Sequence, residues 1–229
     1  MGRLDSDIAV IAAADATHLD AIRSAYRAEG ATVVVAAAGD DAEPLPADED
    51  GWRELLKSVR ERHGRLDILV NLVPTPAPGT IAATKLDEFR TAAEQTIDFV
   101  FASSRAAVMA FREAAAEGEA ASGAIVNVTS FASHMGLSRG ANLNAVAAAV
   151  WNLTRQFGIE TGESHDRIRV NSIHVGPTPA EAAALGLPVT SVADAAEDVA
   201  AAAVYLASAA ARLVTAADIV IDGGLTAGR

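Results

Sequence analysis

The sequence predicts an α/β fold built on one doubly wound parallel sheet. Two observations support this prediction: short apolar runs alternate with longer amphipathic segments, and the short runs are continuously apolar rather than alternating with polar residues. Continuous apolar runs suit strands that are buried on both faces, as in parallel sheets covered by helices. Neither a linker nor an internal repeat interrupts the chain, so we expect a single domain at 1–229.

The expected elements follow one another in strand–helix order. Strands are expected at 7–12, 32–37, 66–72, 124–129, 168–174 and 217–222, with a further short strand inside the acidic loop at 40–50. Helices are expected at 19–29, 52–62, 86–116, 142–160 and 193–209. The helix at 142–160 has very few charges, so we expect it to be buried on most faces. Ligands of such folds bind at the carboxyl ends of the strands.

Composition and charge exclude several classes of function. The formal net charge of −12 repels phosphate backbones and anionic lipid headgroups, so nucleic-acid and membrane partners are not expected. The start of the chain shows no secretory signal, and no apolar run is long enough for a membrane span, so we expect a cytoplasmic protein. The absence of cysteine and the scattered positions of the five histidines predict no metal site.

Several blocks of the sequence together resemble the short-chain dehydrogenase/reductase family. They are GRLDILVN at 64–71, GAIVNVTS at 123–130, IRVNSIHVG at 168–176 and LVTAADIVIDGG at 213–224. The resemblance runs from about residue 7 to residue 224 and implies one Rossmann-type domain with about seven parallel strands. Residues 38–50 are too short for the second crossover helix that the family usually carries, so we expect that helix to be short or missing.

The resemblance places the family's cofactor positions on unsuitable side chains. The three glycines of the diphosphate-binding turn correspond to Ala13, Thr17 and Leu19, and larger residues there would crowd the path of the diphosphate. The residues that read the adenosine ribose correspond to Ala37 and Ala38, which can bind neither NAD nor NADP in the family's way. We therefore expect no cofactor bound by this chain.

Neighbouring residues also argue against a cofactor bound in the family's manner. Asp15 adds a negative charge to a turn that the family uses for phosphates. His18 could bind an anion, but we favour an ordinary loop histidine. After the expected strand at 66–72, the family's NNAG stretch reads Asn71-Leu72-Val73-Pro74, which keeps one asparagine and loses the glycine.

The resemblance also locates the family's catalytic set. The serine corresponds to Ser130, the tyrosine to Leu143, the lysine to Ala147 and the asparagine to Thr96. Leucine cannot exchange a proton, and alanine can neither lower a neighbouring pKa nor hold a ribose. The sequence therefore predicts no catalytic residues, with Ser130 left as a remnant.

These losses lead to our main functional hypothesis. The long helices from Leu86 and from Asn142 correspond to the family's subunit interface and remain rich in apolar and small residues. We therefore predict a catalytically inactive subunit that supports an active short-chain dehydrogenase in a heterodimer or heterotetramer, with NAD(P) on the partner. The inactive subunit of 2-(α-hydroxybenzyl)succinyl-CoA dehydrogenase is a precedent in the family. A homo-oligomer is the other assembly to expect.

Two other functions remain open. One is a cofactor-independent enzyme or small-molecule binder that uses the cleft around Ser130, Thr96 and His174, including a hydrolytic pair of Ser130 with His174 or His134. The other is an NAD(P)-dependent oxidoreductase with a rebuilt site. Activity that is lost in Ser130→Ala would favour the first, and tight NADH or NADPH binding would favour the second.

Overall fold

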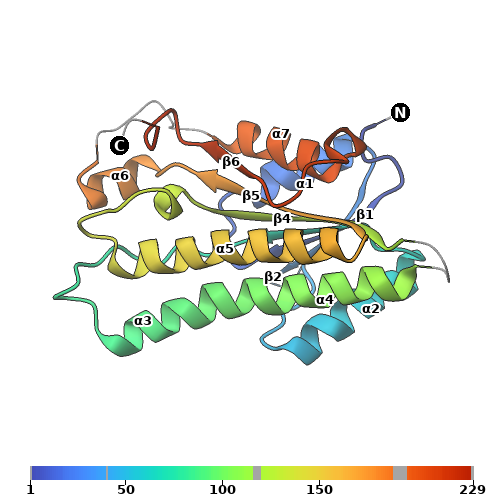
Figure 1. The fold of residues 1–229 in the computed structure, drawn as a ribbon, viewed down its shortest axis with the longest axis horizontal. Helices are drawn as coiled ribbons and strands as arrows, with labels where there is room; N and C mark the ends of the chain where they lie inside the picture. The colour runs from blue at the N-terminus through green and yellow to red at the C-terminus, as the bar shows by residue number, and fades with distance from the viewer. Residues whose placement is uncertain (1, 40, 116–119, 188–194, 228–229) are drawn as a thin grey trace.

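The computed structural model describes residues 2–39, 41–115, 120–187 and 195–227. It confirms the predicted fold class: a parallel sheet with the strand order β2-β1-β3-β4-β5-β6 is covered by helices on both faces (Figure 1). The strands are β1 (Ile8–Ala13), β2 (Thr32–Ala37), β3 (Ile68–Leu72), β4 (Ser122–Ser130), β5 (Arg167–Val175) and β6 (Asp218–Ile221). The order reverses beside β1, where a doubly wound fold opens its ligand crevice.

Helices form the outer two layers of the fold. They are α1 (Leu19–Ala28), α2 (Glu49–His63), α3 (Leu86–Ala93), α4 (Phe99–Ala114), α5 (Ala141–Glu163), α6 (Pro179–Leu185) and α7 (Ala196–Ala207), with short 3₁₀ turns at Phe131–Ser133 (η2) and Ala209–Ala211 (η3). In Figure 1, α1 and α7 lie on one side of the sheet, and α2, α4 and α5 lie on the other. None of the described helices is long and apolar enough to cross a membrane.

The central strand β1 shows why the strands read as continuous apolar runs. All of its residues are buried. Ala9 and Ile11 pack against α1 and α7, whereas Ile8 and Val10 pack against α2 and α4. A strand that contacts helices on both faces has no position for a polar side chain, which confirms the expected burial.

The acidic loop differs from the prediction. Within the described residues, the segment between β2 and α2 forms only an isolated bridge from Ala36 to Glu43, so the expected short strand is absent and the sheet has six strands instead of about seven. Pro44 and Pro46 lack the N–H group that a strand would donate to its neighbour, which explains why pairing stops there. The same short, proline-containing segment leaves no room for the second crossover helix, which we expected to be short or missing.

The long helix expected at 86–116 is interrupted. A π-helical segment, η1 (Glu94–Asp98), separates α3 from α4. Thr96 lies in the middle of η1, is 1 % exposed, and donates from Oγ1 to the Ala92 carbonyl at 2.6 Å. Single π turns inside helices occur frequently at functional sites, and this one lies beside the carboxyl edge of the sheet.

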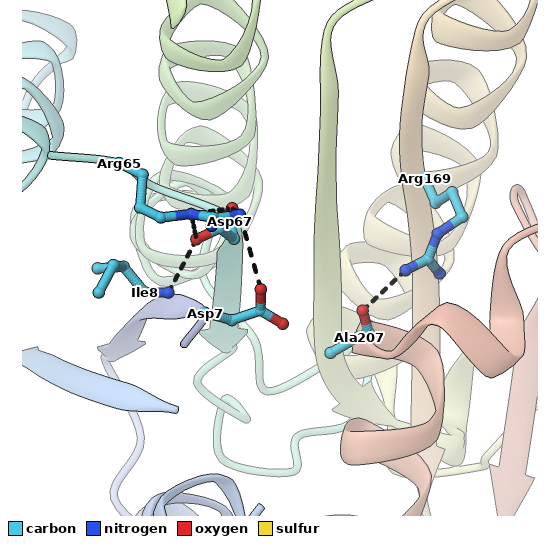
Figure 2. A network of polar contacts seen from close by, with 6 residues as sticks. All are labelled: Asp7, Ile8, Arg65, Asp67, Arg169 and Ala207. Atoms are coloured by element: carbon cyan, nitrogen blue, oxygen red, sulfur yellow. Dashed lines mark hydrogen bonds and ion pairs between the residues drawn. The ribbon is translucent and has the colours of Figure 1, made fainter. Parts of the chain in front are cut away.

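Polar contacts that are part-buried or exposed fix the opposite, amino-terminal edge of the sheet (Figure 2). Asp67 accepts a hydrogen bond from the Ile8 N–H at 2.9 Å and pairs with Arg65 at 2.6 Å, which ties β1 to β3. Arg169 donates to the Ala207 carbonyl at 2.9 Å and to the neighbouring carbonyls at the end of α7. A cation at a helix C-terminus satisfies carbonyls that lack helical partners and complements the helix dipole.

Candidate functional site

The carboxyl ends of the strands surround a cavity of about 180 Å³, called here the inner cavity. The β1–α1 turn, the ends of β3 and β4, and the segment from β5 into α6 contribute its walls. Its polar lining residues are Asp15, Thr17, His18, Thr75, Thr129, Ser130, Thr178 and Glu181. This is the edge at which folds of this class bind ligands, so the inner cavity is the candidate site.

The four positions that the resemblance assigned to catalysis lie together. Ser130, Thr96, Leu143 and Ala147 line one hollow of about 10 Å³ beside the inner cavity, which leaves room for about one water molecule. Leu143 and Ala147 are buried in an apolar cluster that includes Leu185. The structure thus confirms that these positions converge, while their correspondence to the family's catalytic residues stays a prediction.

The β1–α1 turn carries its own anion. The Asp15 carboxylate accepts hydrogen bonds from the Thr17 N–H at 2.7 Å and from the Thr17 hydroxyl at 2.5 Å. The Leu19 N–H is also used, by the Ala16 carbonyl at 3.1 Å. Because the N–H groups of Thr17 and Leu19 bond within the turn, these two donors are not presented together to a phosphate as in a glycine-rich turn.

A second hollow of about 1230 Å³ lies beyond the turn and is called here the outer hollow. Its walls include the small residues Ala13, Ala37 and Ala38, together with the buried Trp52. Its walls also carry the acidic side chains of Asp48, Glu49, Glu94 and Asp98. Among the described residues that line the outer hollow or the inner cavity there is no lysine or arginine, and Asp15 lines the inner cavity. The turn therefore does not fit a diphosphate held in the family's manner.

Glu181 is a site residue that the sequence analysis missed. It lies in the first turn of α6 and lines the inner cavity together with Ser130. Both residues also line a third hollow of about 170 Å³, whose other walls are mostly apolar. The Glu181 carboxylate accepts from the Thr178 N–H at 2.7 Å and the Thr178 hydroxyl at 2.8 Å. The sequence signal for the helix that carries it was the capping box, in which Thr178 is followed three residues later by Glu181.

The hydroxyl of Ser130 does not pair with a histidine in this structure. Its Oγ accepts a 3.3 Å hydrogen bond from the Ala132 N–H. His174 contacts the Ser133 hydroxyl at 2.6 Å and the backbone carbonyl of Ser130 at 3.3 Å. Burial, followed by the proximity of His134, lowers the pKa of His174 to about 4. The alternative of a hydrolytic pair of Ser130 with His174 or His134 is therefore not supported by the geometry.

Comparison with known proteins gives consistent relatives. Residues 20–226 match a family profile described as enoyl-(acyl carrier protein) reductase. The chain is 33 % identical to trans-4-hydroxycyclohexanecarboxylate dehydrogenase of Sinomonas cyclohexanicum, over 79 % of this chain and 68 % of that protein. It is 29 % identical to meso-2,3-butanediol dehydrogenase of Serratia marcescens, over 98 % and 96 %. A solved short-chain type dehydrogenase/reductase from Mycobacterium marinum superposes with a TM-score of 0.80 at 26 % identity, covering 97 % of this chain and 96 % of that one.

These findings correct the functional prediction. The matching profile is that of a reductase, and the two relatives, which align with 79 % and 98 % of this chain, are named dehydrogenases. The prediction of an inactive subunit, and of a chain that is not an enzyme by itself, is therefore wrong: the relatives indicate an oxidoreductase. They also give no support to the expectation that this chain binds no NAD(P). The prediction rested on the side chains at the motif positions alone, and those positions do not include Glu181, which lines the same cavity.

Proposed function

Because the chain belongs to the short-chain dehydrogenase/reductase family, we propose that it is an NAD(P)-dependent oxidoreductase whose proton-transfer site is rebuilt around Ser130 and Glu181. The family typically binds NAD(P) and acts on hydroxyl or carbonyl groups. The observation that supports the rebuilt site is that the Ser130 hydroxyl and the Glu181 carboxyl line the same two hollows at the carboxyl edge of the sheet.

Ser130 supplies a hydroxyl at the end of a buried strand. Because its Oγ accepts from the Ala132 N–H, its own proton can be donated to the oxygen of a substrate. The end of β4 holds this hydroxyl rigidly, since β4 pairs with β3 on one side and β5 on the other. A hydrogen bond from a fixed donor to the substrate oxygen stabilises the charge that develops on it during reduction.

Glu181 supplies the exchangeable proton that Leu143 and Ala147 cannot. The hydrogen bonds from Thr178 both end on Oε2 of Glu181, so Oε1 is the oxygen that can take or give a proton at the substrate. The side chain is half-buried and stands on α6, across the cavity from the end of β4. It is the acidic group that shares both reaction-side hollows with Ser130.

The hollow that Ser130 and Glu181 share with apolar side chains indicates the kind of substrate. Most of its wall is apolar and its volume is about 170 Å³; the apolar residues are Pro76, Ala77, Pro78, Phe131, Leu143 and Leu185. Such a hollow accepts a small, largely apolar alcohol or ketone and excludes large or highly charged molecules. The acidic groups near it disfavour anionic substrates in particular.

The proposal is tested by mixing the purified protein with NADH or NADPH and with each of a panel of small linear and cyclic ketones. We expect cofactor oxidation that depends on the ketone. Because a positioned acid–base group contributes roughly 10²–10⁴-fold, Glu181→Gln should lower kcat by about 100-fold or more. The matched control is Glu61→Gln, which removes an exposed carboxylate on α2 away from the cavity.

The results also show how the proposal would fail. Equal losses in Glu181→Gln and Glu61→Gln would show that Glu181 has no special role. A protein that neither binds nor oxidises either cofactor with any ketone in the panel would overturn the proposed activity. Circular dichroism of each variant separates a lost function from a lost fold.

A further inference from the structure

We propose a binding site for a divalent metal ion of the zinc class at His134, His174 and Asp218. The three side chains come from different elements: His134 follows η2, His174 lies on β5, and Asp218 begins β6. One ligand atom from each lies within 4.8 Å of the other two. Two imidazoles and a carboxylate are ligands that Zn²⁺ prefers, and three protein ligands are the usual set when a water completes the tetrahedron.

The spacing of His134 and Asp218 suits a shared ion better than a direct hydrogen bond. The Nε2 atom of His134 is buried and makes no hydrogen bond to any residue that the structure describes, although Oδ2 of Asp218 is 3.5 Å away. Tetrahedral zinc ligands that each lie about 2.0–2.2 Å from the ion stand about 3.4 Å apart. A buried nitrogen without a partner is costly, and a metal ion would remove that cost.

His174 is held in a way that also suits a ligand. Its Nε2 contacts the Ser172 hydroxyl at 2.9 Å, and its Nδ1 contacts the Ser133 hydroxyl at 2.6 Å. A metal ion would bind one of these two nitrogens and displace the serine hydroxyl from it. The other nitrogen would keep its contact with the second serine hydroxyl. Metal-binding histidines generally use the second ring nitrogen in this way, which fixes the orientation of the ring.

The surroundings orient the carboxylate and leave access for the ion. Trp151 Nε1 donates to Oδ1 of Asp218 at 3.4 Å, so Oδ2 remains on the side of His134. The side chains of His134 and Asp218 are 18 % and 24 % exposed, which provides a path from solvent. The ring of His134 packs 4.9 Å from that of Trp151 and 4.5 Å from that of His174, so the two imidazoles already lie side by side.

A bound ion would connect the edge strand β6 to the segment that follows Ser130. β6 is short and pairs only with β5. The three ligands therefore join the least-paired strand of the sheet to η2, the turn that leaves the candidate site. This role is structural and does not depend on the proposed redox activity.

The test uses zinc alone, without cofactor or substrate. The protein is stripped with a chelator, titrated with ZnCl₂ by calorimetry, and unfolded thermally with and without zinc. We expect one zinc per chain and a rise in Tm, because a ligand that binds only the folded state stabilises it. A tetrahedral Co²⁺ absorption spectrum is expected when cobalt replaces zinc.

Variants decide whether the ion is held by these residues. His134→Gln and Asp218→Asn should each abolish the zinc-dependent rise in Tm, whereas His63→Gln, which alters an exposed histidine at the end of α2, should retain it. The Tm values without zinc show whether each variant folds. No zinc binding by the unaltered chain, or binding that survives both ligand substitutions, overturns the proposal.

Discussion

The Asp15 carboxylate should weaken dinucleotide binding, and Asp15→Asn should strengthen it. Asp15 is half-buried, and its Oδ1 atom lies 2.7 Å from the Thr17 nitrogen, inside the turn where relatives hold a diphosphate. Two like charges about 4 Å apart repel by roughly 1 kcal/mol in water and about 4 kcal/mol at a protein surface. We take the repulsion between these limits, at about 1.4–2.8 kcal/mol. Removing the charge should then raise the affinity for the dinucleotide by about 10- to 100-fold.

Asparagine is the informative substitution because it keeps an oxygen at the same position. The Thr17 N–H retains its acceptor, so the turn is preserved while the charge is removed. Affinity is measured by titrating NADH and NADPH against the protein fluorescence at low and high salt. The advantage of Asp15→Asn should shrink at high salt, since salt screens exposed charges.

The control is Asp87→Asn, an exposed aspartate at the start of α3 that lines neither the inner cavity nor the outer hollow. It should leave both affinities unchanged. If Asp15→Asn binds NADH and NADPH no more tightly than the unaltered chain, the argument that this carboxylate opposes the diphosphate is refuted.

Three further predictions concern stability. Arg169→Met should lower the free energy of unfolding by about 1–3 kcal/mol in urea titrations, because it removes a half-buried donor from carbonyls at the end of α7; an unchanged midpoint would contradict this. Ala147→Leu should cost about 1–3 kcal/mol through overpacking, since Ala147 is buried and the hollow that it lines is only about 10 Å³; a protein with undiminished urea stability would show that the site has more room. Burial alone would raise the pKa of Asp222, but hydrogen bonds from Thr226 and Gly224 lower it below 3.8. Its contribution to stability is therefore complete above the unfolded pKa and lost as the pH falls through the lowered one, so Thr226→Val should reduce stability at pH 6 more than at pH 2.

The sheet was predictable because strands that are buried on both faces read as continuous apolar runs in the sequence. Strand β2 was predicted with its observed bounds, and the other strands within a few residues. The π segment at Glu94–Asp98 was not predictable, because one extra residue per turn barely changes the apolar spacing of a long helix. Helix α6 was missed, although Thr178 and Glu181 carry its capping signal.

The site was predictable only where the resemblance marked positions. Ser130, Thr96, Leu143 and Ala147 do converge, as the family pattern implied. Glu181 could not be placed from the sequence, because nothing in its segment shows which side of α6 faces the cavity. The same holds for groups such as His134 and Asp218, which meet only after distant segments fold together.

The measurement that tests the central claim most directly is kcat/KM with NADH or NADPH and a small ketone, for the unaltered chain, for Glu181→Gln and for the control Glu61→Gln. The account predicts turnover by the unaltered chain that Glu61→Gln retains and that Glu181→Gln lowers by about 100-fold or more. Failure of the unaltered chain to consume either NADH or NADPH, or equal rates for Glu181→Gln and the unaltered chain, would contradict it.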